Sequence, residues 1–423
     1  MAPTSSSSCR VLMVARRPVH PAVLSGTPHF MLQELRRQVG AVDVLDDMIP
    51  ECSARTFSKG GFDLAARAAW VALRYGAWRL VGRRRDWDRC ALLSRYYARR
   101  IEEYLRSHPC DVIFADKAFV ELAYLETDLP ILYSHDAVYR DLLGYDRTFE
   151  RLTGRAVAEA VKLERRATAR AGLCVYSSAW AARGAERHLG LPETNLRVAH
   201  TGPNLDAKHL PDDASFVPRR PSEMCHLLLV GVDWQRKGCA LAVDTMRLVR
   251  QAGVPCVLTL VGPRPPRRTV LPEGVTLVPR LDKTRPHDLR RLLDLYRAAS
   301  FFILPSRAEC LSMAHVEAMA FGLPCLGTQV GGTAEIIEQG RNGFLLPVEA
   351  DARAYADHIV QAWRDATRYQ QLSDQARQTQ RARFTWERWG RTMRACIDEL
   401  LARRADEPTP PTGAVSPGRG RHP

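Results

Sequence analysis

Two glutamates with the chemistry of a sugar-binding site, Glu309 and Glu317, stand eight positions apart in "RAECLSMAHVEAMAFGLP". The apolar run "SFFILPS" predicts a strand before the first, and Gly-Leu-Pro ends a predicted helix that starts near Ser312. A loop carboxylate can accept hydrogen bonds from sugar hydroxyls, and one inside the helix from a ribose. Between them, free backbone N–H groups around Leu311, Ser312 and Met313 can bind phosphate oxygens.

A second loop of this kind, in "LLLVGVDWQRKGCALAVDTM", carries two cations. Arg236 and Lys237 follow a predicted strand and open a predicted helix, whose N-terminus already favours anions. Alone, such charges are often merely solvated at a helix entry, but the position after a strand favours a diphosphate site. A third turn holds Gly331 and Gly332, which would permit close backbone approach to a ligand or serve turn geometry alone.

Short apolar runs, which are candidate strands, alternate along the chain with amphipathic segments, which are candidate helices. The loops described above connect these elements and are positioned by them. Two such series predict an α/β fold with two Rossmann-like, doubly wound parallel sheets, whose strand ends face each other across a cleft. The predicted strands are 10–15, 41–46, 111–115, 130–135, 173–178, 226–231, 256–262, 274–279, 300–306 and 324–328.

The order of these segments predicts two domains and a final helix that packs back on the first domain. Both ends of the chain are rich in Ser, Pro or Gly without apolar periodicity, so we expect them to be disordered. The predicted divisions are a disordered 1–8, an N-terminal Rossmann-like domain 9–203, a linker 204–223, a C-terminal Rossmann-like domain 224–384, a crossover helix 385–404 and a disordered tail 405–423.

The composition of the 423 residues narrows the class of protein. A net charge of +14 favours phosphate, nucleic acid or anionic lipid as a partner without choosing among them. Eleven cysteines without a CxxC pair or zinc spacing favour reduced thiols, a cytoplasmic location and no structural metal. No nucleic-acid-binding motif accompanies the charge, so we expect no nucleic-acid partner.

The basic charge is concentrated in residues 59–106, where one Lys and eleven Arg stand against five acidic residues. Aromatic residues and an apolar stripe at helical spacing accompany it. Three interpretations remain open. The segment could lie on the inner face of an anionic membrane, form a funnel for a phosphorylated acceptor, or be an ordinary amphipathic helix with a solvated Arg face.

Taken together, these motifs resemble a known family. "ECLSMAHVEAMAFGLP" looks like the E-x7-E signature of retaining glycosyltransferases with the GT-B fold, in particular the large family 4 group. Further similar stretches are "SGTPHFMLQELRR", "VGVDWQRKG", "LYRAASFFILPS" and "GGTAEIIEQGRNGFLLP". The resemblance implies a GT-B fold and covers roughly residues 10–400.

The resemblance also implies roles for residues of the second domain. Glu309 would touch the donor sugar near the reacting carbon, and Glu317 would hold the ribose of the nucleotide. Lys237 matches a lysine that binds the donor diphosphate together with an arginine. Relatives often place that arginine where this chain has Val232, so Arg236 is the candidate replacement.

In the first domain the resemblance points to two turns. His135 and Asp136 end a predicted strand where relatives commonly keep a histidine or aspartate near the sugar and acceptor, although a lone histidine is as often structural. Gly26 and Thr27 open a helix at the cleft and could approach the donor phosphate or the acceptor. Ser312 departs from the Phe-Gly pair that relatives often carry after the first glutamate.

The implied reaction is retaining transfer of a sugar from a nucleotide-diphosphate sugar to an acceptor hydroxyl of a carbohydrate, lipid-linked or small molecule. It calls for no cofactor and no metal ion, because the two cations and the helix N-terminus can stabilise the leaving diphosphate. Two alternatives stay open. One is a non-catalytic subunit that binds a nucleotide sugar or glycan, and the other is a nucleotide-sugar epimerase of similar fold.

Overall fold

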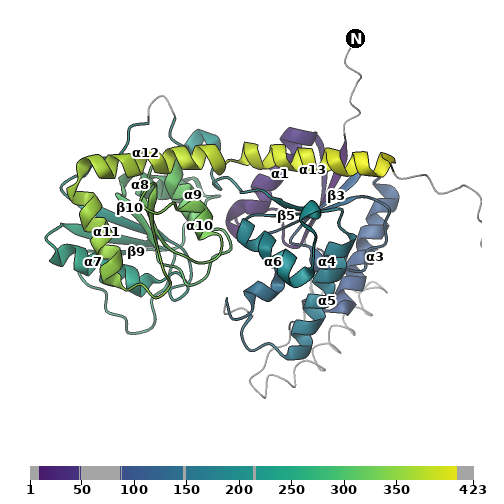
Figure 1. Cartoon of the computed structure of the whole chain (residues 1–423), viewed down its shortest axis with the longest axis horizontal. Coiled ribbons are helices and arrows are strands. Elements are labelled where there is room, and N and C mark those ends of the chain that lie inside the picture. The colour runs from purple at the N-terminus through teal and green to yellow at the C-terminus, as the bar shows by residue number, and fades with distance from the viewer. Residues whose placement is uncertain are drawn as a thin grey trace, which may run out of the picture.

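The structure is a computed structural model that describes residues 9–46, 48, 86, 88–145, 149–212 and 216–406. The chain forms two α/β domains that lie side by side, each built on a six-stranded sheet (Figure 1). Every pairing within the two sheets is parallel, as expected for strands that alternate with helices. The predicted pair of doubly wound sheets is confirmed.

The N-terminal sheet has the strand order β2-β1-β3-β4-β5-β6. Its central strands are almost wholly buried, since helices cover both faces, and this explains their continuous apolar runs. The strands are β1 (Arg10–Ala15), β2 (Ala41–Leu45), β3 (Val112–Asp116), β4 (Ile131–His135), β5 (Leu173–Tyr176) and β6 (Leu196–Val198).

The C-terminal sheet has the strand order β12-β11-β10-β7-β8-β9. Strand β10 pairs with β7 and β11, so the loops that follow these strands lie beside one another. The strands are β7 (Cys225–Val230), β8 (Cys256–Val261), β9 (Val275–Val278), β10 (Phe301–Leu304), β11 (Cys325–Thr328) and β12 (Gly343–Leu346).

Helices pack on both faces of each sheet and enclose separate apolar cores. The N-terminal helices are α1 (Thr27–Val39), α3 (Ala91–Ser107), α4 (Phe119–Leu122), α5 (Gly154–Arg170) and α6 (Ala179–Leu189). The C-terminal helices are α7 (Cys239–Gln251), α8 (Pro286–Ala298), α9 (Met313–Ala320), α10 (Thr333–Ile336), α11 (Ala352–Arg364) and α12 (Ala366–Arg383).

The last helix, α13 (Trp386–Asp406), leaves the C-terminal domain and runs along the N-terminal one (Figure 1). Trp389, Met393 and Ile397 are buried in the apolar core that α1 and β1 also form. The Trp386 ring stacks on Phe30 of α1 with 5.8 Å between ring centroids. The predicted return of this helix to the first domain is therefore confirmed, and it runs to Asp406, two residues beyond its predicted end.

Strands β6 and β12 were not predicted from the sequence. Strand β6 has three residues and an exposed end, and strand β12 has four and begins with glycine, so neither shows a clear strand pattern. The tail predicted to be disordered was 405–423, but Ala405 and Asp406 belong to α13. The rest of that tail lies outside the described part of the chain, as do residues 1–8 and much of the basic segment 59–106. Among the described helices, none is both long enough and apolar enough to span a bilayer.

Candidate active site

Glu309, Lys237 and Arg236 meet at the carboxyl ends of the neighbouring strands β10 and β7. Lys237 Nζ lies 2.5 Å from Glu309 Oε1, and Arg236 Nη1 lies 3.7 Å from the same oxygen. Burial pushes the pKa of Glu309 upward, but Lys237 and Arg236 outweigh burial, so the pKa lies below its ordinary value. The carboxylate is therefore ionised and fixed between two cations.

Two glycines allow these loops to come so close. The Lys237 stem passes over Gly231, where an added Cβ would lie 2.8 Å from its Cγ. Gly238 precedes α7 with φ +66°, and a Cβ there would lie 2.1 Å from the Pro305 carbonyl oxygen. A larger residue at Gly238 would separate the loop after β7 from the loop after β10. One at Gly231 would displace the Lys237 side chain that reaches Glu309.

The N-terminus of α9 lies next to Glu309. Ser312 is the N-cap, yet its side chain makes no capping hydrogen bond. The hydroxyl is buried, and no described residue partners it. The first N–H groups of a helix lack partners within the helix, so this end offers several donors to one ligand. Leu311 and Met313 flank the hydroxyl and line the pocket between the domains.

Glu317 lies inside α9, as predicted, and its carboxylate already has partners. Lys283 Nζ donates to Oε1, and the Tyr296 hydroxyl donates to Oε2 at 3.0 Å. Only 3% of the residue is exposed. Each carboxylate oxygen can accept a further hydrogen bond, so a ribose hydroxyl could join this arrangement without breaking it. Lys283 was not predicted as a partner of Glu317, because it lies 34 residues away and no motif links the two.

The facing edge of the N-terminal sheet presents a polar group at the ends of β3 and β4. His135 Nδ1 accepts the backbone N–H groups of Asp136 and Ala137 at 3.0 and 3.1 Å, which leaves the hydrogen of a neutral ring on Nε2. Burial lowers the pKa of His135 below its ordinary value, which also favours the neutral ring. Lys117 donates to the Asp136 carboxylate and holds the pKa of Asp136 far below its ordinary value despite burial.

Sequence reasoning missed Lys117 and the buried Asp116 beside it. Burial raises the pKa of Asp116 to about 6, and its Oδ1 has no partner among the described residues. Lys117 has φ +54°, a backbone conformation that is uncommon outside glycine and that often marks functional turns. Both residues directly follow the predicted strand 111–115, and that position was the available signal.

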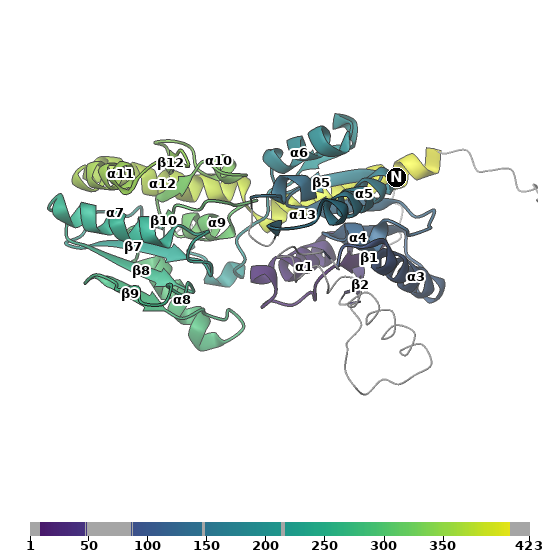
Figure 2. The same cartoon turned by 90° about the horizontal axis from the view of Figure 1, so that it is seen from below.

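Residues of both domains line one pocket, including Thr27 and Met31 of α1 and Met313 of α9. These two helices lie on either side of the boundary between the domains (Figure 2). The Thr27 hydroxyl accepts a hydrogen bond from Asn204 Nδ2 at 2.8 Å. Gly26 is buried directly before α1 with φ +94°. The lining also includes Asp116, Lys117, His135, Asp136 and Leu311. The structure therefore brings Thr27, His135 and Asp136 to the same pocket as the start of α9, whereas Gly26 lies next to this lining.

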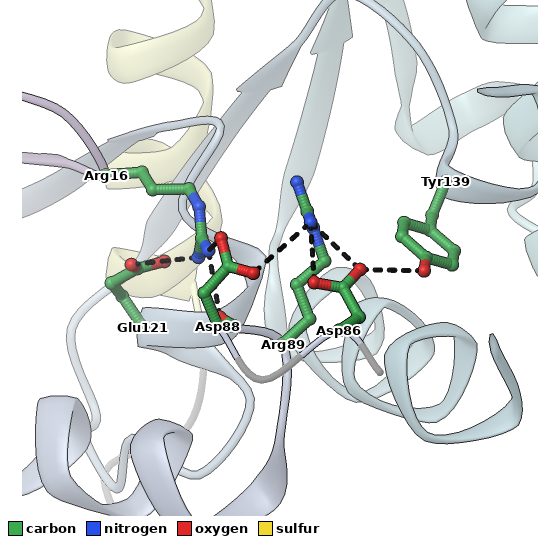
Figure 3. Close-up of polar contacts among 6 residues, drawn as sticks. All are labelled: Arg16, Asp86, Asp88, Arg89, Glu121 and Tyr139. Carbon is green, nitrogen blue, oxygen red and sulfur yellow. Dashed lines mark hydrogen bonds and ion pairs between the residues drawn. The ribbon is translucent and has the colours of Figure 1, made fainter. Parts of the chain in front are cut away.

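A second ion-pair cluster, also absent from the sequence predictions, follows the same edge of the N-terminal sheet (Figure 3). Arg16, directly after β1, bonds Asp88 at 3.0 Å and Glu121 at 3.3 Å. Burial raises the pKa of Asp86 to about 6, with a further contribution from a hydrogen bond to Asp88. The cluster consists of Arg16, Asp86, Asp88, Arg89, Glu121 and Tyr139. Two arginines face three carboxylates here, and among the described residues neither Glu121 Oε2 nor Arg89 Nε has a hydrogen-bond partner.

Gly331 and Gly332 contact protein rather than an open cavity. A Cβ on Gly331, where φ is +53°, would lie 1.6 Å from the Glu309 carbonyl oxygen. A Cβ on Gly332 would lie 2.5 Å from the Cys310 carbonyl oxygen. These glycines therefore admit the loop that carries Glu309.

Comparisons with known proteins agree with this architecture. Residues 225–365 match the family model described as glycosyl transferases group 1. N-acetyl-alpha-D-glucosaminyl L-malate synthase of Bacillus anthracis is 33% identical over 95 residues, which are 22% of this chain and 25% of that protein. The match to this curated relative thus spans about a quarter of its length.

Solved structures match nearly the whole chain. Sucrose-phosphate synthase from Thermosynechococcus elongatus superposes with a TM-score of 0.66 at 17% identity, over 93% of this chain and all of that one. Anabaena HepE, solved with UDP and glucose, superposes with a TM-score of 0.58 at 16% identity, over 92% and 100%. Residues 225–365 thus match the model of glycosyl transferases group 1, and the chain as a whole has the two-domain GT-B fold.

Proposed function

We propose that the chain transfers a sugar from a nucleotide-diphosphate sugar to an acceptor hydroxyl, with retention of configuration at the anomeric carbon. The observation that carries the proposal is the convergence of Glu309, Lys237 and Arg236 beside the open N-terminus of α9. The similarity to N-acetyl-alpha-D-glucosaminyl L-malate synthase supports it, as does the similarity to HepE, whose structure contains UDP and glucose.

In this reaction the bond between the anomeric carbon and the β-phosphate oxygen breaks, and the acceptor oxygen bonds the same face of that carbon. The acceptor proton passes to the leaving phosphate. Arg236, Lys237 and the N–H groups at Leu311–Met313 would stabilise the negative charge that develops on the diphosphate. The Ser312 hydroxyl would donate to it as well.

Glu309 would accept hydrogen bonds from hydroxyls of the donor sugar, and Glu317 from the ribose. Lys237 keeps the Glu309 carboxylate ionised. The negative charge of this carboxylate could also stabilise the positive charge that develops at the sugar ring. His135, Asp136, Thr27 and Gly26 would face the acceptor or the donor phosphate from the other domain. The scheme assigns no step to a metal ion or cofactor.

A thermal-shift screen against UDP-, GDP- and ADP-sugars would identify the donor, because a ligand that binds the folded state stabilises it. We expect one nucleotide class to raise the Tm and the others to leave it unchanged. Proton NMR of the product formed with a panel of sugar, lipid-linked and small-molecule acceptors would then report the anomeric configuration. An inverted product would refute the retaining part of the proposal.

A non-catalytic nucleotide-sugar-binding protein is the second candidate. Val232, which occupies the position of the usual arginine, is 57% exposed and offers no charge to a diphosphate. Release of the nucleotide from the donor without acceptor separates the two functions, since a binding protein would leave the donor intact. A position at an anionic membrane surface remains a proposal based on the charge of residues 59–106, and liposome cosedimentation tests it.

A further inference from the structure

Tyr145, a residue of the N-terminal domain, holds the backbone of Glu309 in the other domain. Its hydroxyl donates to the Glu309 carbonyl oxygen at 2.9 Å and accepts the Glu309 N–H, also at 2.9 Å. One side chain thus satisfies both main-chain polar groups of the residue proposed to contact the donor sugar. The two residues are 164 positions apart.

The Tyr145 ring is itself held in place. It stacks on Trp180, with 5.5 Å between ring centroids and 30° between the planes. Trp180 lies in the first turn of α6, and the N–H groups of Ala179 and Trp180 donate to the Glu335 carboxylate at 2.8 and 3.0 Å. Glu335 belongs to the C-terminal domain, so the aromatic pair is anchored across the domain boundary as well.

The glycine turn after β11 leaves room for this contact. A Cβ on Gly331 would lie 2.8 Å from the Tyr145 hydroxyl oxygen and 1.6 Å from the Glu309 carbonyl oxygen. A Cβ on Gly332 would lie 2.9 Å from the Cβ of Ser178, the N-cap of α6. A side chain at either glycine would push the N-terminal domain away from the Glu309 loop.

We propose that Tyr145 is a positioning residue that orients Glu309 toward the donor sugar, and does so only while the two domains are in contact. The inference rests on the proposed function. Lys237 holds the Glu309 carboxylate from within the same domain, whereas Tyr145 holds the Glu309 N–H and carbonyl oxygen from the other domain. Hydrogen bonds within the C-terminal domain hold the neighbouring residues Ala308 and Cys310. Separation of the domains would therefore release the backbone at Glu309 itself.

Hydrogen–deuterium exchange on the full chain tests the contact without any substrate. In Tyr145→Phe the ring and its stacking on Trp180 remain, but the Glu309 N–H loses its acceptor. Exchange at the Glu309 amide, resolved by overlapping peptides, should become about tenfold faster because one hydrogen bond is lost. The matched control is Tyr124→Phe, since Tyr124 packs between Arg95 and Arg166 away from the cleft.

Steady-state kinetics with the nucleotide sugar found in the thermal-shift screen tests the positioning role. Tyr145→Phe should lower kcat about tenfold and change the donor KM less than twofold, since the donor contacts lie in the C-terminal domain. Tyr124→Phe should match the wild type in both constants. A purely structural role would lower the melting temperature without this split between kcat and KM.

The outcomes are distinguishable. Unchanged exchange at Glu309 in Tyr145→Phe would overturn the inference, as would faster exchange with wild-type kcat. If the wild-type chain neither cleaves a nucleotide sugar nor transfers its sugar, the proposed function fails and the positioning role of Tyr145 in that reaction fails with it. Faster exchange together with a lowered kcat would support both.

Discussion

The ion pair between Lys237 and Glu309 gives a prediction whose size follows from its burial. Only 11% of the lysine side chain and 8% of the glutamate side chain are exposed. Removal of one partner from a fully buried pair costs about 3–5 kcal/mol, whereas an exposed pair contributes less than about 1 kcal/mol. Arg236 Nη1 lies 3.7 Å from the same Glu309 oxygen, so it would still compensate part of the carboxylate charge when Lys237 is replaced. We therefore expect Lys237→Met to lower the free energy of unfolding by about 2 kcal/mol.

A double-mutant cycle checks the physical cause. Glu309→Gln alone leaves the Lys237 cation nearly buried without its partner, so it should also destabilise the domain. The double variant carries neither charge. Its loss in the free energy of unfolding should therefore be smaller than the sum of the two single losses, by at least about 1 kcal/mol. Urea unfolding of the C-terminal domain and its Tm measure this, and about 2 kcal/mol corresponds to a fall of roughly 4–8 °C. Additive losses, or a single-variant loss below about 0.5 kcal/mol, would refute the reasoning.

Three further predictions follow from individual contacts. Gly331→Ala should lower the free energy of unfolding in urea by at least about 2 kcal/mol, because the added Cβ would clash with the Glu309 carbonyl oxygen. The matched control is Gly340→Ala, where φ is +70° and the added Cβ would meet only the flexible end of the Arg368 side chain. This control should cost about 1 kcal/mol. Burial raises the pKa of Glu164 to about 8 from 4.5, so its stabilising contribution is complete below pH 4.5 and is lost as the pH rises to about 8. Glu164→Gln, which can still accept the Tyr139 N–H, should therefore flatten the fall in Tm between pH 5 and 8, and an unchanged profile would contradict the assignment. The rate of sugar transfer in excess EDTA should equal the rate without EDTA. A loss of activity that a divalent cation restores would contradict the metal-independent scheme.

The fold and the centre of the site could be predicted because each depends on a local pattern. Buried parallel strands read as continuous apolar runs, and ligand loops of such sheets follow the strand ends. Lys237 and Glu309 are 72 residues apart, yet both follow predicted strands, and these strands turn out to be neighbours. The prediction that Glu309 and Lys237 share a site therefore needed only the strand order.

The remaining contacts depend on the relative placement of distant elements, which no spacing in the chain encodes. Tyr145 lies in an irregular loop, and nothing near it in the sequence points to Glu309. In the sequence, Asp86 and Asp88 look like ordinary acidic residues within a basic segment. Their part in an ion-pair cluster appears only in the structure, where Arg16 contacts Asp88. Gly331 looked like a turn that could admit a ligand, but the space it leaves is taken by the Glu309 loop.

The most direct test of the proposed active site is turnover of the nucleotide sugar by Glu309→Gln. This variant keeps the shape of the side chain and removes the carboxylate charge that lies between Lys237 and Arg236. The account predicts a fall in kcat of about 100-fold or more, as for loss of one preorganised electrostatic contact, with a folded chain by circular dichroism. Glu349→Gln, at an exposed position of the same domain, should keep wild-type turnover. Wild-type turnover by Glu309→Gln would contradict the proposed site.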